Sequence, residues 1–222
     1  MKDYLNIFYS DKNNENNPYP QKLVKNIINL LDADEHKHML EMGIGMCDHA
    51  KIFKSLGLNI EGFDISNVSF ERGKELEIPV ELFNCESEKW PYDDNSFDYI
   101  YSKSFIEHMT NPLSVLLESH RVLNTGGKII TLTPDWEKNF KRFYDDFTHC
   151  RPFTTASLKK IHEAAGFKVL EVKRIKQLPF TWNSKFLDNL MSIIGMFVPT
   201  RCNTKILRWS RELMIVVVAQ KI

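Results

Sequence analysis

The stretch HMLEMGIGMCDHA, residues 38–50, decides the fold of this chain. A short apolar run ends in Glu41, passes Gly43 and Gly45, and continues into a segment with helical spacing. Glycines let a ligand approach the backbone, and the start of a helix offers unpaired N–H groups. The acidic residue can hold a hydroxyl or an amine of that ligand. The stretch therefore predicts a strand that turns tightly beneath a nucleotide.

Strands and helices alternate along the rest of the chain. The spacing of apolar residues predicts helices over 23–31, from residue 50 to Gly57, over 67–76, from Pro112 to a stop at Gly126–Gly127, and from a cap at Thr155 to Gly166. Strands are predicted at 38–41, up to Asp64, up to Asn84, and at 97–102, 128–133, 167–175 and 213–222. This alternation indicates βαβ units, an α/β fold with a parallel sheet covered on both faces.

Composition limits the classes of function. The 222 residues contain 43% apolar residues, which fits one globular domain. Lys plus Arg equal Asp plus Glu at 29 each, so the chain has no net positive charge that would favour nucleic acid as a partner. The start of the chain lacks the apolar core of a signal peptide, and no run approaches the roughly 18 apolar residues of a membrane span. We expect a cytoplasmic protein without stable membrane insertion.

No metal site is expected from the sequence. The four cysteines are scattered without paired spacing, which disfavours a zinc ribbon and a disulfide scaffold. His36 and His38 lie two residues apart beside a strand start, and no third ligand follows nearby.

Three segments fall outside the alternating pattern. Residues 1–20 are polar and predict a surface arm, or an arm whose Tyr4, Phe8, Tyr9 or Tyr19 closes over a ligand. Residues 134–153 and 177–210 predict insertions on the substrate side of one domain spanning 1–222. The second insertion contains the apolar run 186–198, which we expect to form a lid or packing helix; a membrane-surface or dimer contact is the alternative. The chain is expected to be a monomer or a homodimer.

The spacing between two acidic residues narrows the class of ligand that the loop can bind. Asp64 lies 23 positions beyond Glu41, where nucleotide-binding folds place the carboxylate that accepts from ribose hydroxyls. A turn-capping role for Asp64 is the alternative. A nicotinamide dinucleotide site would require a glycine three positions after Gly45, but that position is Asp48, whose charge would repel a pyrophosphate. The loop therefore disfavours a dinucleotide.

Four separated motifs together resemble a known family. They are the ExGxG pattern at 41–45, the strand ending in Asp64, the segment WPYDDNSFDYIYSKSFIEHM at 90–109 and the segment HRVLNTGGKIITLTP at 120–134. In this order they resemble class I S-adenosylmethionine-dependent methyltransferases over residues 25–175 and the last strand. The resemblance implies a Rossmann-like α/β fold with a seven-stranded, mostly parallel sheet, helices on both faces, and the last strand antiparallel between the fifth and sixth. It implies S-adenosylmethionine as cofactor and S-adenosylhomocysteine as product.

The resemblance also implies which residues contact the cofactor: Glu41, Gly43, Gly45, Asp64, Ile65, Asn84, Cys85, Glu86 and Ser102. The acid and glycines of the loop and Ser102 would face the methionine end, Asp64 the ribose, and the segment from Asn84 the adenine. Two positions depart from the family pattern. Cys47 replaces the usual third glycine, and Asn84 replaces an Asp, although its side-chain oxygen can accept the same hydrogen bond.

Methyl transfer to a hydroxyl needs an in-line nucleophile and a base that removes its proton. The segment DDFTHCRPF, residues 145–153, offers His149 as that base, with Asp146 beside it. Arg151 could clamp a phosphate or carboxylate of the acceptor, and Tyr144 is a further candidate for acceptor binding. His108, in the EH pair, is the competing base. The alternative is that these residues only bond the insertion to the core.

The D-x-TH-x-RPFT pattern at 146–154, followed by a helix ending in AAGF, resembles a subgroup of these methyltransferases found among bacterial glycan and cell-surface polysaccharide genes. We therefore expect O-methylation of a small-molecule or carbohydrate-linked acceptor. A quinone or lipid methyltransferase is an alternative, and so is a non-catalytic binding subunit that retains the fold.

Overall fold

The computed structural model describes residues 17–222 and has one seven-stranded sheet in the order β3-β2-β1-β4-β5-β7-β6. The strands are β1 (His38–Met42), β2 (Asn59–Asp64), β3 (Val80–Leu82), β4 (Phe97–Lys103), β5 (Leu123–Pro134), β6 (Phe167–Lys176) and β7 (Leu213–Lys221). The first five strands pair in parallel, whereas β7 runs antiparallel to both β5 and β6. This confirms the expected sheet and the position of its last strand.

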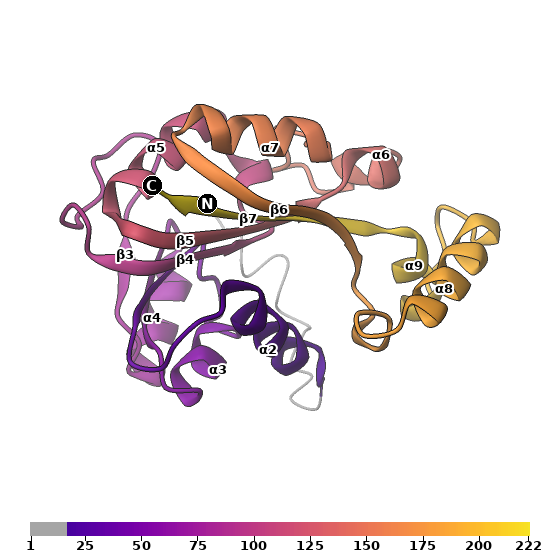
Figure 1. Cartoon of the computed structure of the whole chain (residues 1–222), viewed down its shortest axis with the longest axis horizontal. Coiled ribbons are helices and arrows are strands. Elements are labelled where there is room, and N and C mark those ends of the chain that lie inside the picture. The colour runs from indigo at the N-terminus through magenta and orange to yellow at the C-terminus, as the bar shows by residue number, and fades with distance from the viewer. Residues whose placement is uncertain (1–16) are drawn as a thin grey trace.

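Helices cover both faces of the sheet (Figure 1). One face carries α2 (Tyr19–Leu31), α3 (Ala50–Ser55) and α4 (Asn67–Leu76), and the other carries α5 (Pro112–Val122) and α7 (Thr155–Ala164). Each face has its own buried apolar core: Leu23, Ile27 and Phe53 belong to one, and Leu116 and Leu158 to the other. Burial of this apolar area is the main stabilising term of such a layered fold.

Helices α7 and α5 have boundaries that differ from the prediction. The N-cap of α7 is Thr154 rather than Thr155, because the Thr154 side chain accepts from the Ser157 N–H while the Ser157 hydroxyl accepts from the Thr154 N–H. Helix α5 ends at Val122, before the predicted Gly126–Gly127 stop. A Cβ on Gly127 would lie 2.9 Å from the Asp98 carbonyl oxygen, so this glycine permits close approach of β4 and β5 instead of ending a helix.

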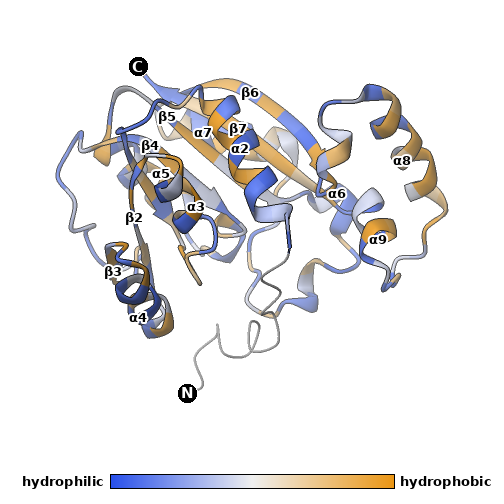
Figure 2. Cartoon of the chain, turned by 90° about the horizontal axis from the view of Figure 1, so that it is seen from below, coloured by the Kyte–Doolittle hydropathy of each residue, from blue (hydrophilic) through white to orange (hydrophobic). Residues whose placement is uncertain are grey.

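The third strand is shorter than predicted and ends two residues before Asn84. Six further helices connect the strands: η1 (Ile106–His108) follows β4, α6 (Trp136–Asn139) and η2 (Phe143–Asp145) follow β5, and η3 (Pro179–Thr181), α8 (Lys185–Phe197) and α9 (Lys205–Arg211) follow β6. Helices α8 and α9 lie beyond one end of the sheet, and Figure 2 shows that α8 is largely apolar. Within residues 17–222, no helix is both long and apolar enough to cross a membrane.

Only residues 17–20 of the predicted N-terminal arm are among the described residues. Tyr4, Phe8 and Tyr9 lie outside the described residues. Tyr19, expected in the arm, begins α2, and its ring contacts Trp182 and Trp209 at centroid distances of 6.4 and 5.3 Å. This residue therefore packs the helix against the segment after β6.

Candidate functional site

The carboxyl ends of β1, β2 and β4 bring the predicted cofactor residues to one edge of the sheet. Met42 lies opposite both Phe63 of β2 and Ser102 of β4. Glu41 lies opposite Tyr101, one residue before Ser102 on β4, while Asp64 ends the strand on the other side of β1. Ligands of open α/β sheets bind outside the carboxyl ends of the strands.

The glycine loop after β1 turns with positive φ at Gly43 (67°) and Gly45 (53°). A Cβ on Gly43 would lie 2.4 Å from the Phe105 ring, whereas a Cβ on Gly45 would have no neighbour within 4 Å among the described residues. Gly43 is thus required by packing, and the described part of the chain leaves space beside Gly45. A ligand can approach the loop at Gly45.

The amides of this loop are not available to a phosphate, contrary to the expectation from sequence. The N–H groups of Gly43 and Ile44 both donate to the Phe63 carbonyl oxygen at 3.0 Å. The Gly45 N–H donates to Asp64 Oδ2 at 2.9 Å. Because phosphate sites rely on unpaired amides, this geometry disfavours a pyrophosphate and leaves side chains to contact the ligand.

Two buried polar atoms at this edge have no hydrogen-bond partner among the described residues: Glu41 Oε2 and Ser102 Oγ. The other Glu41 oxygen lies 3.7 Å from His49 Nδ1, an atom that the Tyr101 hydroxyl approaches to 3.2 Å. Burial raises the pKa of Glu41, and His49 opposes this shift. Buried polar atoms in proteins are almost always paired, so an acceptor and a hydroxyl left over on adjacent strands suit the amine and carboxylate of an amino acid.

Asp64 and Ile65 supply a second contact region. Asp64 accepts from the N–H groups of Gly45 and Ser66, at 2.9 and 3.0 Å. Burial raises the pKa of Asp64, and these hydrogen bonds oppose the shift. The next residue, Ile65, exposes 71% of its surface. A carboxylate that can accept from hydroxyls, next to an exposed apolar side chain, suits a ribose and the flat base attached to it.

The predicted adenine segment forms a turn after β3. Asn84 Oδ1 accepts from the Glu86 N–H at 3.1 Å. The Glu86 carboxylate accepts from the Thr110 hydroxyl at 3.0 Å and from the Asn111 N–H at 2.5 Å, and Cys85 is buried. Glu86 therefore fixes this turn to the start of α5. A carbonyl oxygen has two lone pairs, so the Asn84 oxygen retains capacity for a further donor.

These residues fit S-adenosylmethionine better than they fit a dinucleotide. The unpaired Glu41 oxygen suits the cationic amine, the unpaired Ser102 hydroxyl suits the carboxylate, and Asp64 suits the ribose. The acidic character of the loop also suits a sulfonium, which is positively charged.

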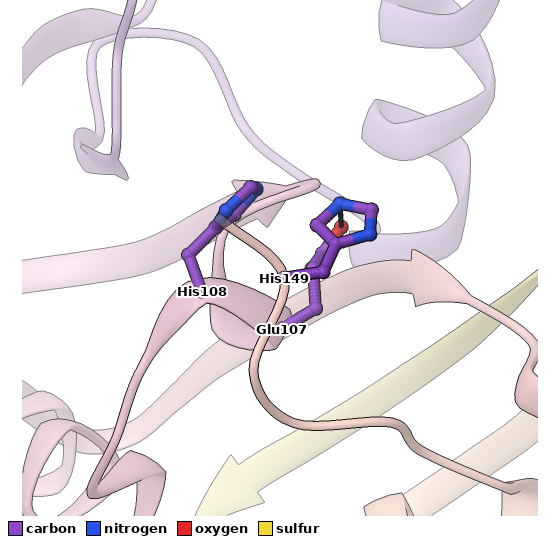
Figure 3. Close-up of side chains that lie close together, drawn as sticks. All are labelled: Glu107, His108 and His149. Atoms are coloured by element: carbon purple, nitrogen blue, oxygen red, sulfur yellow. Dashed lines mark ion pairs between the residues drawn. The ribbon is translucent and has the colours of Figure 1, made fainter. Parts of the chain in front are cut away.

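A second group of side chains, Glu107, His108 and His149, gathers where β4 meets the insertion after β5 (Figure 3). One ligand atom from each, a ring nitrogen or a carboxylate oxygen, lies within 4.8 Å of the others. His149 Nδ1 lies 2.6 Å from the Phe143 carbonyl oxygen, so Nδ1 carries the hydrogen and donates it. His149 Nε2 then faces Glu107 Oε1 at 4.0 Å and Asp146 Oδ2 at 3.9 Å. A set of this kind can share a proton or hold a cation.

Glu107 is the member of this cluster that sequence reasoning missed. Its side chain is fully buried; Oε2 accepts from the Thr133 hydroxyl at 2.8 Å, and Oε1 has no hydrogen-bond partner among the described residues. Burial raises the pKa of Glu107 to about 7. The signal lies in the EH pair at 107–108, where the acid directly follows the apolar residues Phe105 and Ile106.

Asp146 and Thr148 orient His108. The Thr148 hydroxyl lies 2.6 Å from Asp146 Oδ1 and 2.9 Å from His108 Nδ1, so it donates to the carboxylate and accepts from the imidazole. Burial and the nearby His149 lower the pKa of His108. Although burial opposes it, the hydrogen bonds from Thr148 hold the pKa of Asp146 below its ordinary value. The structure thus brings together Asp146 and the two histidines that the sequence offers as competing bases, His149 and His108.

Arg151 and Tyr144 are placed differently. The Arg151 guanidinium donates through Nε and Nη2 to the Thr110 carbonyl oxygen, at 3.2 and 2.9 Å, and its N–H donates to the Glu107 carbonyl oxygen at 2.9 Å. This residue therefore fastens the insertion to the core. Tyr144 is exposed, with its ring against Trp136 and Phe143.

Comparisons with known proteins identify the family of the chain. A family model described as a methyltransferase domain matches residues 15–172. Sterol 4-C-methyltransferase strm-1 of Caenorhabditis elegans is 26% identical over 182 residues, covering 76% of this chain and 54% of that protein. Demethylmenaquinone methyltransferase of Staphylococcus epidermidis is 28% identical over 114 residues, covering 49% and 47%. The chain spans about half the length of these curated relatives.

Solved structures match the fold over most of the chain. A Haloferax volcanii protein, solved in complex with the methyltransferase activator Trm112, is 16% identical with a TM-score of 0.72, covering 91% of this chain and 89% of that one. Haemonchus contortus phosphoethanolamine N-methyltransferase 2, in complex with S-adenosyl-L-methionine, is 19% identical with a TM-score of 0.63, covering 90% and 52%. At these identities the structures establish the fold alone.

Proposed function

Because the chain belongs to the methyltransferase domain family, we propose that it is an S-adenosylmethionine-dependent O-methyltransferase for a small-molecule or carbohydrate-linked acceptor. The observation that carries this proposal is the pair of clusters at one edge of the sheet. One cluster has buried polar atoms on Glu41 and Ser102 that no residue from 17 to 222 pairs with, and the other has a buried carboxyl group, Glu107, facing an imidazole.

In the first cluster, Glu41 and Ser102 bind the amino-acid end of the donor and Asp64 its ribose. Ile65 lies against the base, and Asn84, Cys85 and Glu86 form the turn beside it. When bound, S-adenosylmethionine supplies a methyl group on a positively charged sulfur. Gly43 and Gly45 keep the loop close enough to the strand ends for these contacts.

In the second cluster, His149 accepts the proton of the acceptor hydroxyl at Nε2. Its Nδ1–H bond to the Phe143 carbonyl oxygen fixes the ring, and Glu107 and Asp146 stabilise the imidazolium that forms. His108, held by Thr148, packs edge-on against His149 at a centroid distance of 4.7 Å. A hydroxyl acceptor requires such a base, whereas a neutral amine does not. Tyr144 and Arg151 are proposed to contact the acceptor from the rim of the insertion.

The experiment that tests this proposal is a screen of acceptors with release of S-adenosylhomocysteine as readout. Free sugars, sugar nucleotides, lipid-linked sugars and phenols would be compared with primary amines of similar size. The proposal predicts turnover with a hydroxyl acceptor and none with the matched amines. Turnover restricted to amines or to carbon nucleophiles would exclude the O-methyltransferase assignment.

A lipid or quinone acceptor is the second candidate. Two relatives are named as sterol and demethylmenaquinone methyltransferases, and the segment after β6 is unusually apolar at its surface. A non-catalytic subunit is favoured by two departures from the family pattern: Asn84, and the buried Cys47, which has a φ of 57° where the family has glycine. Any measurable methyl turnover would exclude the non-catalytic subunit.

A further inference from the structure

Helices α8 and α9 extend from the same edge of the sheet as the candidate site. They connect the end of β6 to the start of β7, and those two strand ends pair through Lys176 and Leu213. The next residue, Met214, pairs with Pro134 at the carboxyl end of β5. Strands β1, β4 and β5 run in parallel, so their carboxyl ends lie on this side as well. Figure 1 shows the two helices projecting beyond the sheet.

The outer face of α8 is an exposed apolar stripe. Phe186, Leu190, Ile193 and Phe197 follow the spacing i, i+4, i+7 and i+11, which places them on one side of the helix. Phe186 exposes 75% of its surface and Phe197 exposes 82%. Among the described residues, seven of the sixteen large apolar side chains with high exposure lie between 186 and 207: Phe186, Leu190, Ile193, Met196, Phe197, Ile206 and Leu207. Such a concentration marks an interaction surface.

The opposite face of α8 already holds the helix in place. Met191 and Gly195 are buried there. The buried Lys176 ammonium donates to Asp188 Oδ1 at 2.5 Å and to Ser192 Oγ at 2.9 Å. The packing of α8 on the rest of the chain is therefore satisfied without the stripe, which makes the stripe available to a partner. A stripe that faces outward does not suit a lid over the site.

The charges around the stripe are nearly all positive. Lys185, Arg201 and Lys205 are exposed beside it. Asp188 is the one acidic residue between positions 183 and 211, and its carboxylate pairs with Lys176. The whole chain has no net formal charge, so this local excess is a feature of the two helices.

A cavity between α6 and α9 adds to this positive charge. Five basic residues line it: Lys138, Lys141, Arg142, Arg208 and Arg211. Glu212, also in its lining, pairs with Arg142 at 3.0 Å and Arg208 at 3.3 Å, which leaves an excess of cations. An apolar stripe bordered by cations is complementary to a bilayer that contains anionic lipids.

We propose that α8 and α9 dock this protein on the surface of an anionic lipid bilayer, with the stripe from Phe186 to Phe197 in the headgroup region and the basic cavity over the lipid phosphates. Helix α8 has 13 residues, whereas a spanning helix needs about 20, so the helix lies in the interface instead of crossing it. The site then faces the membrane side of the protein. A lipid-linked acceptor follows only if the proposed function also holds; docking itself does not depend on it.

Vesicle co-sedimentation of the full chain tests this inference. Vesicles of phosphatidylcholine with one quarter phosphatidylglycerol would be compared with pure phosphatidylcholine. We expect binding to the anionic vesicles, at least about tenfold weaker binding to the neutral ones, and a marked loss at 0.5 M salt. The triple variant Phe186→Asp, Ile193→Asp and Phe197→Asp should lose binding to both, and Lys138→Glu with Lys141→Glu should lose most of the binding to anionic vesicles.

The control variant is Leu117→Asp, which places one aspartate on an exposed apolar position of α5, outside the stripe, and should leave vesicle binding unchanged. Retained binding of S-adenosylmethionine by every variant shows that each is folded and separates this inference from the proposed function.

Sedimentation velocity tests the alternative, in which the stripe is a contact between two copies of the chain. A wild-type dimer that becomes a monomer in the stripe variants, together with no vesicle binding, would assign the face to a second copy of the chain and overturn the inference. Equal binding of wild type and the triple variant would overturn it as well.

Discussion

The Oε1 atom of Glu107 lies 4.0 Å from the Nε2 atom of His149, and no part of the Glu107 side chain reaches solvent. The two residues come from different parts of the chain, one just after β4 and the other in the insertion after β5. A buried carboxyl group whose pKa is near neutrality, beside an imidazole, is a pattern found where proteins move protons.

Stability should depend on pH through Glu107. Burial raises the pKa of this carboxyl group from 4.5 to about 7 in the folded chain, so the folded state binds the proton more tightly than the unfolded state. Its stabilising contribution is complete below pH 4.5 and is lost as pH rises through 7. In wild type the free energy of unfolding should fall by up to about 3 kcal/mol from this group between those values.

Urea denaturation of wild type and Glu107→Gln at several pH values measures this effect. The Gln variant keeps the shape of the side chain and removes the titration, so its stability relative to wild type should improve steadily from pH 5 to pH 8. Asp93→Asn, which makes the same change from carboxylate to amide at an exposed position, serves as the control, and its stability should follow that of wild type. A constant difference between Glu107→Gln and wild type would show that Glu107 does not titrate in this range.

Replacing His149 should separate chemistry from donor binding. His149→Gln removes the proton acceptor at Nε2, and loss of a general base lowers kcat by roughly 10² to 10⁴. Binding of S-adenosylmethionine should be unchanged, because Glu41, Ser102 and Asp64 are intact. The control is His120→Gln, since His120 packs against Phe167 at 5.0 Å, away from the cluster. Equal kcat values for the two variants would remove His149 from the mechanism.

The backbone conformation of Cys47 should destabilise the folded protein. Its φ of 57° is a left-handed conformation, which disfavours a residue with a Cβ by about 1–2 kcal/mol, and the side chain is buried. Cys47→Gly relieves this penalty and Cys47→Ala keeps it. In thermal or urea unfolding we expect the Gly variant to exceed the Ala variant by about 1 kcal/mol. If the Ala variant is the more stable, packing of the Cβ outweighs the backbone term.

Sequence reasoning predicted the sheet well because each strand had a local signal. The bounds of α4, 67–76, and the cap of α5 at Asn111 agree with the prediction, since both depend on residues within one turn of the helix. The glycines at 126 and 127 led to a wrong prediction for the end of α5. In sequence, a glycine that permits close approach of two strands looks the same as one that ends a helix. The role of Gly127 becomes clear only from the structure, where the Asp98 carbonyl oxygen leaves no room for a Cβ.

The candidate site also contains features that the local sequence predicts and features that only the tertiary structure determines. The strand-end positions of Glu41, Asp64 and Ser102 followed from local spacing. By contrast, the pairing of Glu107 with His149 joins residues 42 positions apart, and the use of the loop amides by Phe63 and Asp64 depends on how β2 packs beside β1. These contacts are set by tertiary structure, so no local pattern predicts them.

The most direct test of the account is calorimetric titration of S-adenosylmethionine into wild type and Asp64→Asn. The account predicts one site per chain in wild type and binding weakened about 10- to 100-fold in the variant, because hydrogen bonds from ribose hydroxyls to a charged carboxylate are worth about 1.5–3 kcal/mol. Asp93→Asn, at an exposed position, should bind as wild type does. No heat of binding with folded wild-type protein, or equal affinity in Asp64→Asn, would contradict the account.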